Sequence, residues 1–238
     1  MTTQALSAPS KERFRRWLRS AAVEEARRPA VTLAFAQSVN GTMTRVQGTP
    51  TQLSSYESSR WTHDLRGIHD GIVVGVETVL SDNPRLTCRN GSDPSPLPIV
   101  FDSALRTPRD SALLREHSRV VVVTKSELVM EGRRRYPENV SFIAVSSRER
   151  SIEEALESAR HRYGLASLMV EGGAALLHSF IVKGSFDLLS ISVTARFLSG
   201  YQLGGDSLDR AFTINESYLL GGDLLILGRR GEHHESDR

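Results

Sequence analysis

Val120 to Val123 are four valines in succession, a run that suits few places in a folded protein other than a strand buried on both faces. A strand with one face in water carries apolar residues at alternate positions, and this run does not. Similar short apolar runs occur at AVTLAFA, DGIVVGVETVL, LPIVFDS and VSFIAVSS, and helical stretches separate them. Because such strands belong to sheets covered by helices, the sequence predicts an α/β fold with a mainly parallel central sheet flanked by helices.

The C-terminal half adds a helix and a change of strand direction. The segment SIEEALESARHRYG predicts a helix, since Ile152, Ala155, Leu156 and Ala159 fall on one face and Gly164 is placed to end it. The strand ASLMV, the turn EGG and the helix AALLHSFIVKG follow. The segments FDLLSISVTARFL and SYLLGGDLLILGRR then indicate that the sheet finishes in antiparallel C-terminal strands.

The chain is long enough for one substantial core, and it has no internal repeat or low-complexity linker. We therefore expect a single α/β domain over residues 29–230 of the 238. Residues 1–28 are a basic N-terminal extension, in which the apolar residues Phe14, Trp17, Leu18 and Ala21 predict an amphipathic helix. Its acidic residues make organelle targeting the less favoured alternative. Residues 231–238 are expected to be a disordered polar tail.

Charge and composition count against several classes of partner. The formal net charge is only +2 and the basic residues are dispersed, which disfavours nucleic-acid binding. No apolar run is long enough to cross a bilayer, so no membrane partner is expected. The single cysteine, Cys88, favours a reducing, cytoplasmic location, and we expect it to be a packed strand residue. The histidines lack ligand spacing, so no metal is expected.

A glycine pair at a strand-to-helix junction, Glu171-Gly172-Gly173-Ala174, is the most informative local motif. Glycines let a ligand approach the backbone, and the positive end of the following helix attracts phosphate. The segment therefore predicts a pyrophosphate cradle that includes Gly172, Gly173 and Ala174. The alternative is that the glycines serve only the turn.

Two further strand ends carry candidate cofactor contacts. Gly75 and Thr78 follow a buried strand, and ligands of open α/β sheets gather at the carboxyl ends of the strands. Thr78 could hold a cofactor oxygen or, alternatively, cap a helix. Lys125 follows the valine run and offers a cation for an adenosine 2′-phosphate, together with Arg106, which follows the strand that ends at Asp102-Ser103. A lysine on a solvated loop is the alternative for Lys125.

Arginines gather around the segment from Ser81 to Arg89, with Arg66 upstream. The guanidinium group suits forked hydrogen bonding to a phosphate monoester. If these arginines converge in the fold, they form a site for a phosphorylated small molecule. If they do not, they are ordinary surface residues.

The chain resembles a known family in four segments: TLAFAQSVNG (32–41), THDLRGIHDGIVVGVETVLSDNPRLT (62–87), PIVFDS (98–103) and LMVEGGAALLHSF (168–180). These are similar to segments of the pyrimidine reductases of riboflavin biosynthesis, which share the dihydrofolate-reductase-like fold. The resemblance looks closer to the free-standing fungal and plant-type 2,5-diamino-6-ribosylamino-4(3H)-pyrimidinone 5′-phosphate reductases. The chain is also similar to the C-terminal reductase domain of the bifunctional bacterial deaminase/reductases.

This resemblance implies a reaction and a set of contacts. The reaction is NADPH-dependent reduction of the ribosyl group of 2,5-diamino-6-ribosylamino-4(3H)-pyrimidinone 5′-phosphate to a ribityl chain. The implied NADPH contacts are Ala36, Thr78, Asp82, Ser103 and the turn that begins at Gly172 and Gly173. The implied substrate contacts are Arg66, Leu86, Arg89 and Glu171, and Glu171 is also the candidate catalytic residue.

Two positions depart from the family pattern. Asn40 stands where many relatives have the aspartate of a Ser-Leu-Asp-Gly segment, and an amide cannot act as an acid. Bacterial members place a tryptophan near the position of Gln52.

Other functions are compatible with the same motifs. The alternatives are reduction of the deaminated 5-amino-6-ribosylamino-uracil 5′-phosphate, reduction of a dihydropterin by the same fold, and non-catalytic nucleotide binding. The family also implies a homodimer, for which the apolar strands after Phe186 could supply the interface.

Overall fold

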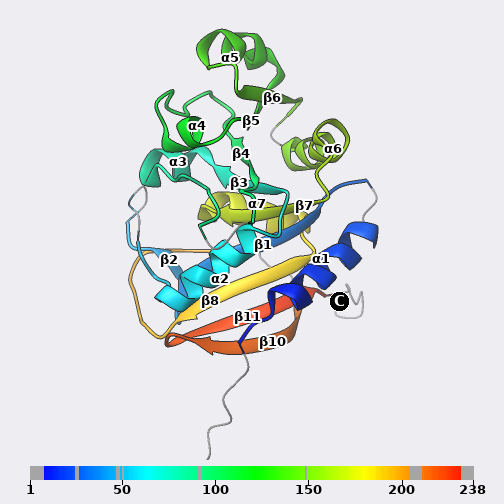
Figure 1. Cartoon of the computed structure of the whole chain (residues 1–238). Helices are drawn as coiled ribbons and strands as arrows, with labels where there is room; N and C mark the ends of the chain where they lie inside the picture. Colours follow the sequence, from blue (N-terminus) through cyan, green and yellow to red (C-terminus); the bar gives the residue numbers. More distant parts are fainter. Residues whose placement is uncertain are drawn as a thin grey trace, which may run out of the picture.

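The computed structural model describes residues 8–24, 27–46, 49, 51–89, 93–147, 149–203 and 211–231. Within them, one nine-stranded sheet has the order β10-β11-β8-β1-β7-β3-β4-β5-β6 (Figure 1). Its strands are β1 (Ala30–Ser38), β3 (Gly71–Gly75), β4 (Leu97–Phe101), β5 (Val120–Lys125), β6 (Val140–Val145), β7 (Ser167–Gly172), β8 (Leu188–Thr194), β10 (Phe212–Leu220) and β11 (Asp223–Arg230). A second, small sheet pairs β2 (Thr42–Thr44) with β9 (Tyr201–Gln202).

The strand directions confirm the prediction of a mainly parallel sheet. Neighbouring strands run parallel from β8 through β1, β7, β3, β4 and β5 to β6. Strand β11 is antiparallel to β8, and β10 is antiparallel to β11. The valine run forms β5, whose residues from Val120 to Thr124 are all buried. Continuous burial of this kind is what helices on both faces of a parallel sheet produce.

The helices cover the two faces of the sheet unequally. They are α1 (Lys11–Glu24), α2 (Tyr56–Arg66), α3 (Val76–Asp82), α4 (Ala112–Glu116), the 3₁₀ helix η1 (Ser126–Leu128), α5 (Val129–Arg135), α6 (Ser151–Tyr163) and α7 (Ala174–Lys183). Helices α6 and α7 pack on one face, in a cluster that includes Leu156, Phe180 and Val170. The opposite face is covered by α1 and α2 over β1, β7, β8 and β11, and by α3 and α4 over β3 to β5.

Helix α1 confirms the amphipathic helix predicted near the N-terminus. Phe14 and Leu18 are buried, and the Phe14 ring meets the Trp61 ring of α2 edge to face at 6.0 Å. Figure 1 shows α1 lying across the sheet beside α2. The predicted polar tail at 231–238 lies outside the described residues except for Gly231.

Some expectations about local structure were wrong. Cys88 is half-buried in an irregular segment rather than in a strand, because α3 ends at Asp82 and the described residues from 83 to 89 form neither a helix nor a strand. Gly75 is the N-cap of α3, so Thr78 lies inside the helix and the capping alternative for it is wrong. The pairing of β2 with β9 was not predicted, since these strands have only three and two residues.

Candidate active site

Glu171 is the penultimate residue of β7, in the middle of the parallel part of the sheet. Side chains alternate along a strand, so Glu171 lies on the same face as Met169. Met169 packs with Trp61 and Leu65 of α2. The alternation therefore turns the Glu171 carboxylate toward the end of α2, where Arg66 is the last residue.

Arg66 and Glu171 form a forked ion pair. Nε of Arg66 donates to Oε1 of Glu171 at 2.6 Å, and Nη2 donates to Oε2 at 2.7 Å. Both side chains are only 14% exposed. Burial opposes the charge of Arg66, yet the nearby carboxylate raises the pKa of the guanidinium above its usual value. Arg66 therefore stays ionised at neutral pH.

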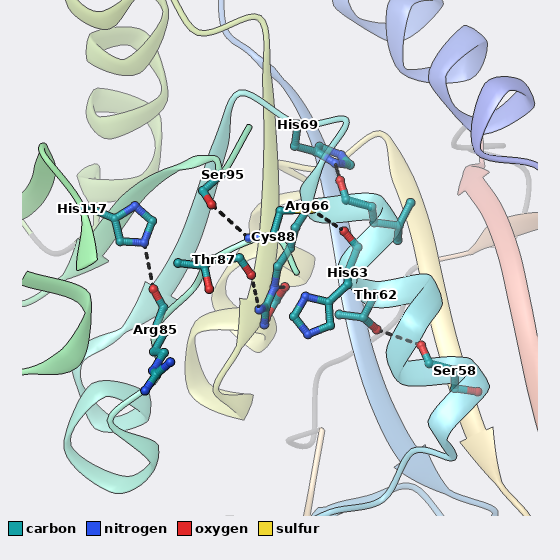
Figure 2. Close-up of polar contacts among 12 residues, drawn as sticks. Ser58, Thr62, His63, Arg66, His69, Arg85, Thr87, Cys88, Ser95 and His117 are labelled. Atoms are coloured by element: carbon teal, nitrogen blue, oxygen red, sulfur yellow. Dashed lines mark hydrogen bonds and ion pairs between the residues drawn. The ribbon is translucent and has the colours of Figure 1, made fainter. Parts of the chain in front are cut away.

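Two hydrogen bonds hold the segment that follows α3 against α2, close to Arg66 (Figure 2). Nη1 of Arg66 donates to the carbonyl of Thr87 at 3.2 Å, and Sγ of Cys88 donates to the carbonyl of His63 at 3.4 Å. Arg89, which is exposed, comes next in the chain. The structure thus brings together three of the four predicted substrate residues: Arg66, Arg89 and Glu171.

Leu86, the fourth predicted substrate residue, has a buried side chain. It is 2% exposed, packs in the cluster with Ile72 and Val74, and has a φ of 56°. A contact between Leu86 and a ligand would therefore have to come from its backbone.

The glycine turn lies directly after Glu171. Gly172 has a φ of 123°, a conformation that side-chain-bearing residues rarely adopt. A Cβ added to Gly173 would lie 3.3 Å from Oγ1 of Thr78, so the turn of β7 and the first turns of α3 approach closely. Gly173 is the N-cap of α7 and makes no side-chain capping bond. The positive end of α7 is therefore open to an anion.

Asn40 ties the end of β1 to the loop after β8. Its Oδ1 accepts from Leu198 N at 3.0 Å and from Ser38 Oγ at 2.8 Å, while its Nδ2 donates to the Leu198 carbonyl at 2.9 Å. An amide can accept and donate in this way, whereas a carboxylate can only accept. Asn40 therefore has a structural task.

A cavity of about 490 Å³ lies near the carboxyl ends of β1 and β8. Gln52 lines it together with Arg45, Val46, Thr49, Thr51 and Arg196. The carbonyl of Arg196 accepts from the backbone N–H of Val39, which places the cavity next to the end of β1. Ala36, near the end of β1, is half-buried.

The remaining predicted cofactor residues come from the segments that follow β3 and β4 and from the end of β5. Asp82 is exposed at the end of α3 and accepts a hydrogen bond from Ser81. Ser103 is exposed two residues after β4. Lys125 is exposed at the end of β5, which β3 and β4 separate from β7.

His63 is a residue of this site that the sequence interpretation missed. It lies three residues before Arg66 in α2, and burial, followed by the charges of Arg66 and Arg89, lowers its pKa below the usual value. The spacing of three, which puts two side chains on one helix face, was the available signal.

The described residues contain neither a membrane-spanning candidate nor a metal-binding cluster. No helix there combines the length and apolar character that a bilayer crossing requires. No group of three or more His, Cys, Asp or Glu side chains in the same residues could hold a metal ion.

Comparison with known proteins gives a consistent set of relatives. A model of the RibD C-terminal domain matches residues 29–225. The 2,5-diamino-6-ribosylamino-4(3H)-pyrimidinone 5′-phosphate reductase of Saccharomyces cerevisiae is 33% identical over 181 residues, covering 71% of this chain and 73% of the yeast protein. The protein of the same name from Archaeoglobus fulgidus is 33% identical over 183 residues, covering 73% of this chain and 83% of the archaeal one.

Solved structures share the fold. A diaminohydroxyphosphoribosylaminopyrimidine deaminase/5-amino-6-(5-phosphoribosylamino)uracil reductase from Thermotoga maritima has a TM-score of 0.76 at 24% identity over 90% of this chain, which spans 60% of that protein. A riboflavin biosynthesis reductase of Saccharomyces cerevisiae has a TM-score of 0.71 at 24% identity, covering 92% of this chain and 99% of the yeast chain. The fold is dihydrofolate-reductase-like. The chain belongs to the RibD C-terminal domain family.

Proposed function

We propose that this protein reduces the ribosyl group of 2,5-diamino-6-ribosylamino-4(3H)-pyrimidinone 5′-phosphate to a ribityl chain, with NADPH as the reductant. Family membership supports a reductase of riboflavin biosynthesis, since the relatives from yeast and Archaeoglobus fulgidus carry the name of this activity. The observation that carries the proposal is the Arg66–Glu171 pair, which stands beside the Gly172–Gly173 turn with Arg89 nearby.

The proposed substrate site uses two kinds of charge. Arg66 has five N–H groups, and three of them donate to Glu171 and Thr87, so two remain for an oxygen of the 5′-phosphate. Arg89 is exposed on the adjoining segment and would supply a second fork. Glu171 keeps Arg66 in place and would orient the polar groups of the substrate from the end of β7.

The proposed cofactor site lies on the other side of Glu171. Gly173 carries no Cβ where one would crowd Thr78, and α7 begins there without a side-chain cap, so a pyrophosphate fits the turn. We assign Gly75, Thr78, Gly172, Gly173 and Ala174 to this contact. Bound NADPH would supply the hydride that reduces C1 of the ribosyl group, while the protein binds, aligns and shields the reactants.

The deaminated compound, 5-amino-6-ribosylamino-uracil 5′-phosphate, is the second candidate substrate. The Thermotoga maritima structure belongs to a protein named for both deamination and reduction, and the chain spans 60% of it. Identity to the free-standing yeast reductase is 33%, against 29% to the riboflavin biosynthesis protein RibD of Aquifex aeolicus. This difference favours the diamino substrate.

NADPH oxidation, followed by absorbance with each of the two pyrimidines in turn, tests the proposal. We expect turnover with the diamino compound. Turnover with only the deaminated compound would replace the first candidate by the second. Absence of oxidation with both compounds would contradict the proposed function.

We also propose that the protein pairs as a homodimer through its C-terminal strands. Strand β10 is an edge of the sheet and exposes Phe212, Ile214 and Leu219. An exposed apolar edge strand is a surface that proteins usually cover. A monomeric mass by light scattering at micromolar concentration would contradict this assembly.

A further inference from the structure

The imidazole of His63 lies beside the Arg66 guanidinium (Figure 2). It makes no hydrogen bond to any other residue that the structure describes. Its Nδ1 atom is buried and has no partner among the described residues. A buried polar atom without a partner costs free energy, so such an atom calls for an explanation.

Two other histidines show what a structural role requires in this fold. His69 is bonded at both ring nitrogens, through Nε2 to Thr32 Oγ1 at 2.8 Å and through Nδ1 to the Leu65 carbonyl at 2.7 Å. His117 is bonded through Nε2 to the Arg85 carbonyl at 2.8 Å. The His63 ring makes no such hydrogen bond within the described part of the chain, so it does not link two elements of the fold.

The charges around His63 come from three elements. Helix α2 contributes Arg66 and Asp64, the segment after α3 contributes Arg89 and the Cys88 thiol, and β7 contributes Glu171. Burial is the largest influence and lowers the pKa of His63, and the two arginines lower it further, against the smaller opposing effect of the acids. The ring is therefore neutral at pH 7.

The surroundings also select one neutral form of the ring. A neutral imidazole carries one proton, on either nitrogen. A proton on Nδ1 would be a buried donor without an acceptor among the described residues. Nε2 is not among the buried atoms that lack a partner, so a proton on Nε2 can reach water or a ligand, and this form is favoured although Nδ1 remains an unpaired acceptor. His63 then presents an N–H donor beside two arginines without adding a third positive charge.

We propose that His63 is a third donor to the phosphate monoester of the substrate, acting as a neutral ring through its Nε2–H beside Arg66 and Arg89. The assignment rests on the proposed function, because it takes the phosphorylated end of the substrate to this cluster. A phosphate has acceptor sites for several donors, and two forks of arginine leave some of them for a further donor. A neutral donor serves this purpose without repelling the arginines when the site is empty.

Two substitutions of His63 distinguish a hydrogen-bond donor from a side chain that only fills space. His63→Gln keeps an amide N–H near the position of Nε2, whereas the shorter His63→Asn reaches only the position of Nδ1. We expect His63→Asn to raise the KM for the phosphorylated substrate about 10- to 100-fold, the effect of losing a hydrogen bond to a charged group, with little change in kcat. His63→Gln should recover most of the loss. The matched control is His161→Asn on α6, where the histidine is exposed.

Binding of ribose 5-phosphate tests the role of His63 without any turnover. Titration of the whole protein should give a dissociation constant at least about tenfold weaker for His63→Asn than for wild type or His161→Asn. Nitrogen NMR of the wild type should place the His63 proton on Nε2. Equal affinity of wild type and His63→Asn, no binding by wild type, or a proton on Nδ1 would each overturn the proposal. Failure of the wild type to reduce either pyrimidine would instead reject the proposed function.

Discussion

Glu171 and Arg66 are coupled so closely that neither can be assigned a role alone. Both oxygens of the carboxylate hold the guanidinium, at 2.6 and 2.7 Å, and the third contact of Arg66 fixes the Thr87 carbonyl. If either charge is removed, the remaining charge stays largely buried without a counterion, and this lowers the free energy of unfolding. The pair therefore contributes both to the stability of the site and to the proposed contact with substrate.

We predict that Glu171→Gln lowers both stability and activity. The amide removes the negative charge and one of the two acceptors, so the free energy of unfolding should fall by about 1.5–3 kcal/mol, the range for hydrogen bonds to charged groups. At the same time kcat/KM should fall at least about 100-fold, because Arg66 loses its orientation. Urea unfolding and steady-state kinetics measure the two effects.

The Arg28–Asp187 pair provides the control for this experiment. It is also a forked pair of similar burial, made by Nη1 and Nη2 of Arg28 at 2.7 and 2.9 Å. It lies at the opposite ends of the strands, where β1 and β8 begin. Asp187→Asn should cost comparable stability and leave kcat/KM of the folded protein within about threefold of wild type, since it touches no ligand. Full activity and affinity in Glu171→Gln would remove Glu171 from the proposed site.

His69 predicts a pH dependence of stability. Burial lowers its pKa in the folded protein to about 4 from 6.5, so between these values the unfolded chain takes up a proton that the folded protein does not. The contribution of His69 is complete above pH 6.5 and falls as the pH drops, by about 2 kcal/mol between pH 6.5 and 5. Urea unfolding at pH 7 and 5 measures it. The loss should be smaller in His69→Gln and unchanged in His161→Gln; equal losses in all three proteins would contradict the assignment.

At the scale of elements, apolar patterning predicted most of the strands and helices correctly. The consecutive apolar runs became β3, β4 and β5, and Gly164 ends α6 with a φ of 68°, as its position in the sequence indicated. Patterning failed where an element is very short, as in β2, or where irregular chain is held by tertiary hydrogen bonds, as around Cys88. In those places residues that are distant in the sequence determine the conformation, and local apolar patterning cannot predict such contacts.

Substitution of Gly173, in the turn between β7 and α7, tests whether the space beside this glycine is needed for cofactor binding, independently of backbone strain. Gly173 has an ordinary φ of −75°, so Gly173→Ala should cost little stability, but its methyl group would fill the 3.3 Å approach to Thr78. We expect the KM for NADPH to rise about tenfold or more. Gly164→Ala is the converse control. No atom lies within 4 Å of a Cβ added at Gly164, but its φ is 68°. The substitution should therefore lower the free energy of unfolding by about 1 kcal/mol and leave the KM for NADPH unchanged. An unchanged KM in Gly173→Ala would exclude a tight cofactor contact there.

At the scale of the whole molecule, one face of the sheet carries the candidate site and α1 completes the core beneath it. Phe14 is 1% exposed and contacts both Trp61 of α2 and the His69 ring that follows this helix. We propose that the N-terminal extension is part of the folded unit.

Phe14→Ala should lower the free energy of unfolding by about 3–5 kcal/mol, as loss of a buried phenylalanine does elsewhere. The substitution Val23→Ala, at a position 81% exposed on the same helix, should change it by less than about 0.5 kcal/mol. Equal stability of both variants would show that α1 packs only loosely.

Assembly of the candidate site could be predicted only in part from the sequence. The strand end at Glu171 and the glycine turn were visible because chemistry-bearing residues follow an apolar run. The direct pairing of Arg66 with Glu171 was not, because it joins residues 105 positions apart through the packing of α2 on β7. His63 was missed although it lies three residues before Arg66, because its significance rests on a buried ring nitrogen that has no partner among the described residues, which a sequence does not display.

Transfer of deuterium from cofactor to product tests the proposed reaction most directly. The protein is incubated with NADPH that carries deuterium at both C4 positions and with 2,5-diamino-6-ribosylamino-4(3H)-pyrimidinone 5′-phosphate. We predict a ribityl product with a single deuterium on C1 of the former ribose, seen by mass spectrometry and NMR. A product without deuterium, deuterium on the pyrimidine ring, or no product from either this compound or its deaminated counterpart would contradict the proposed reaction.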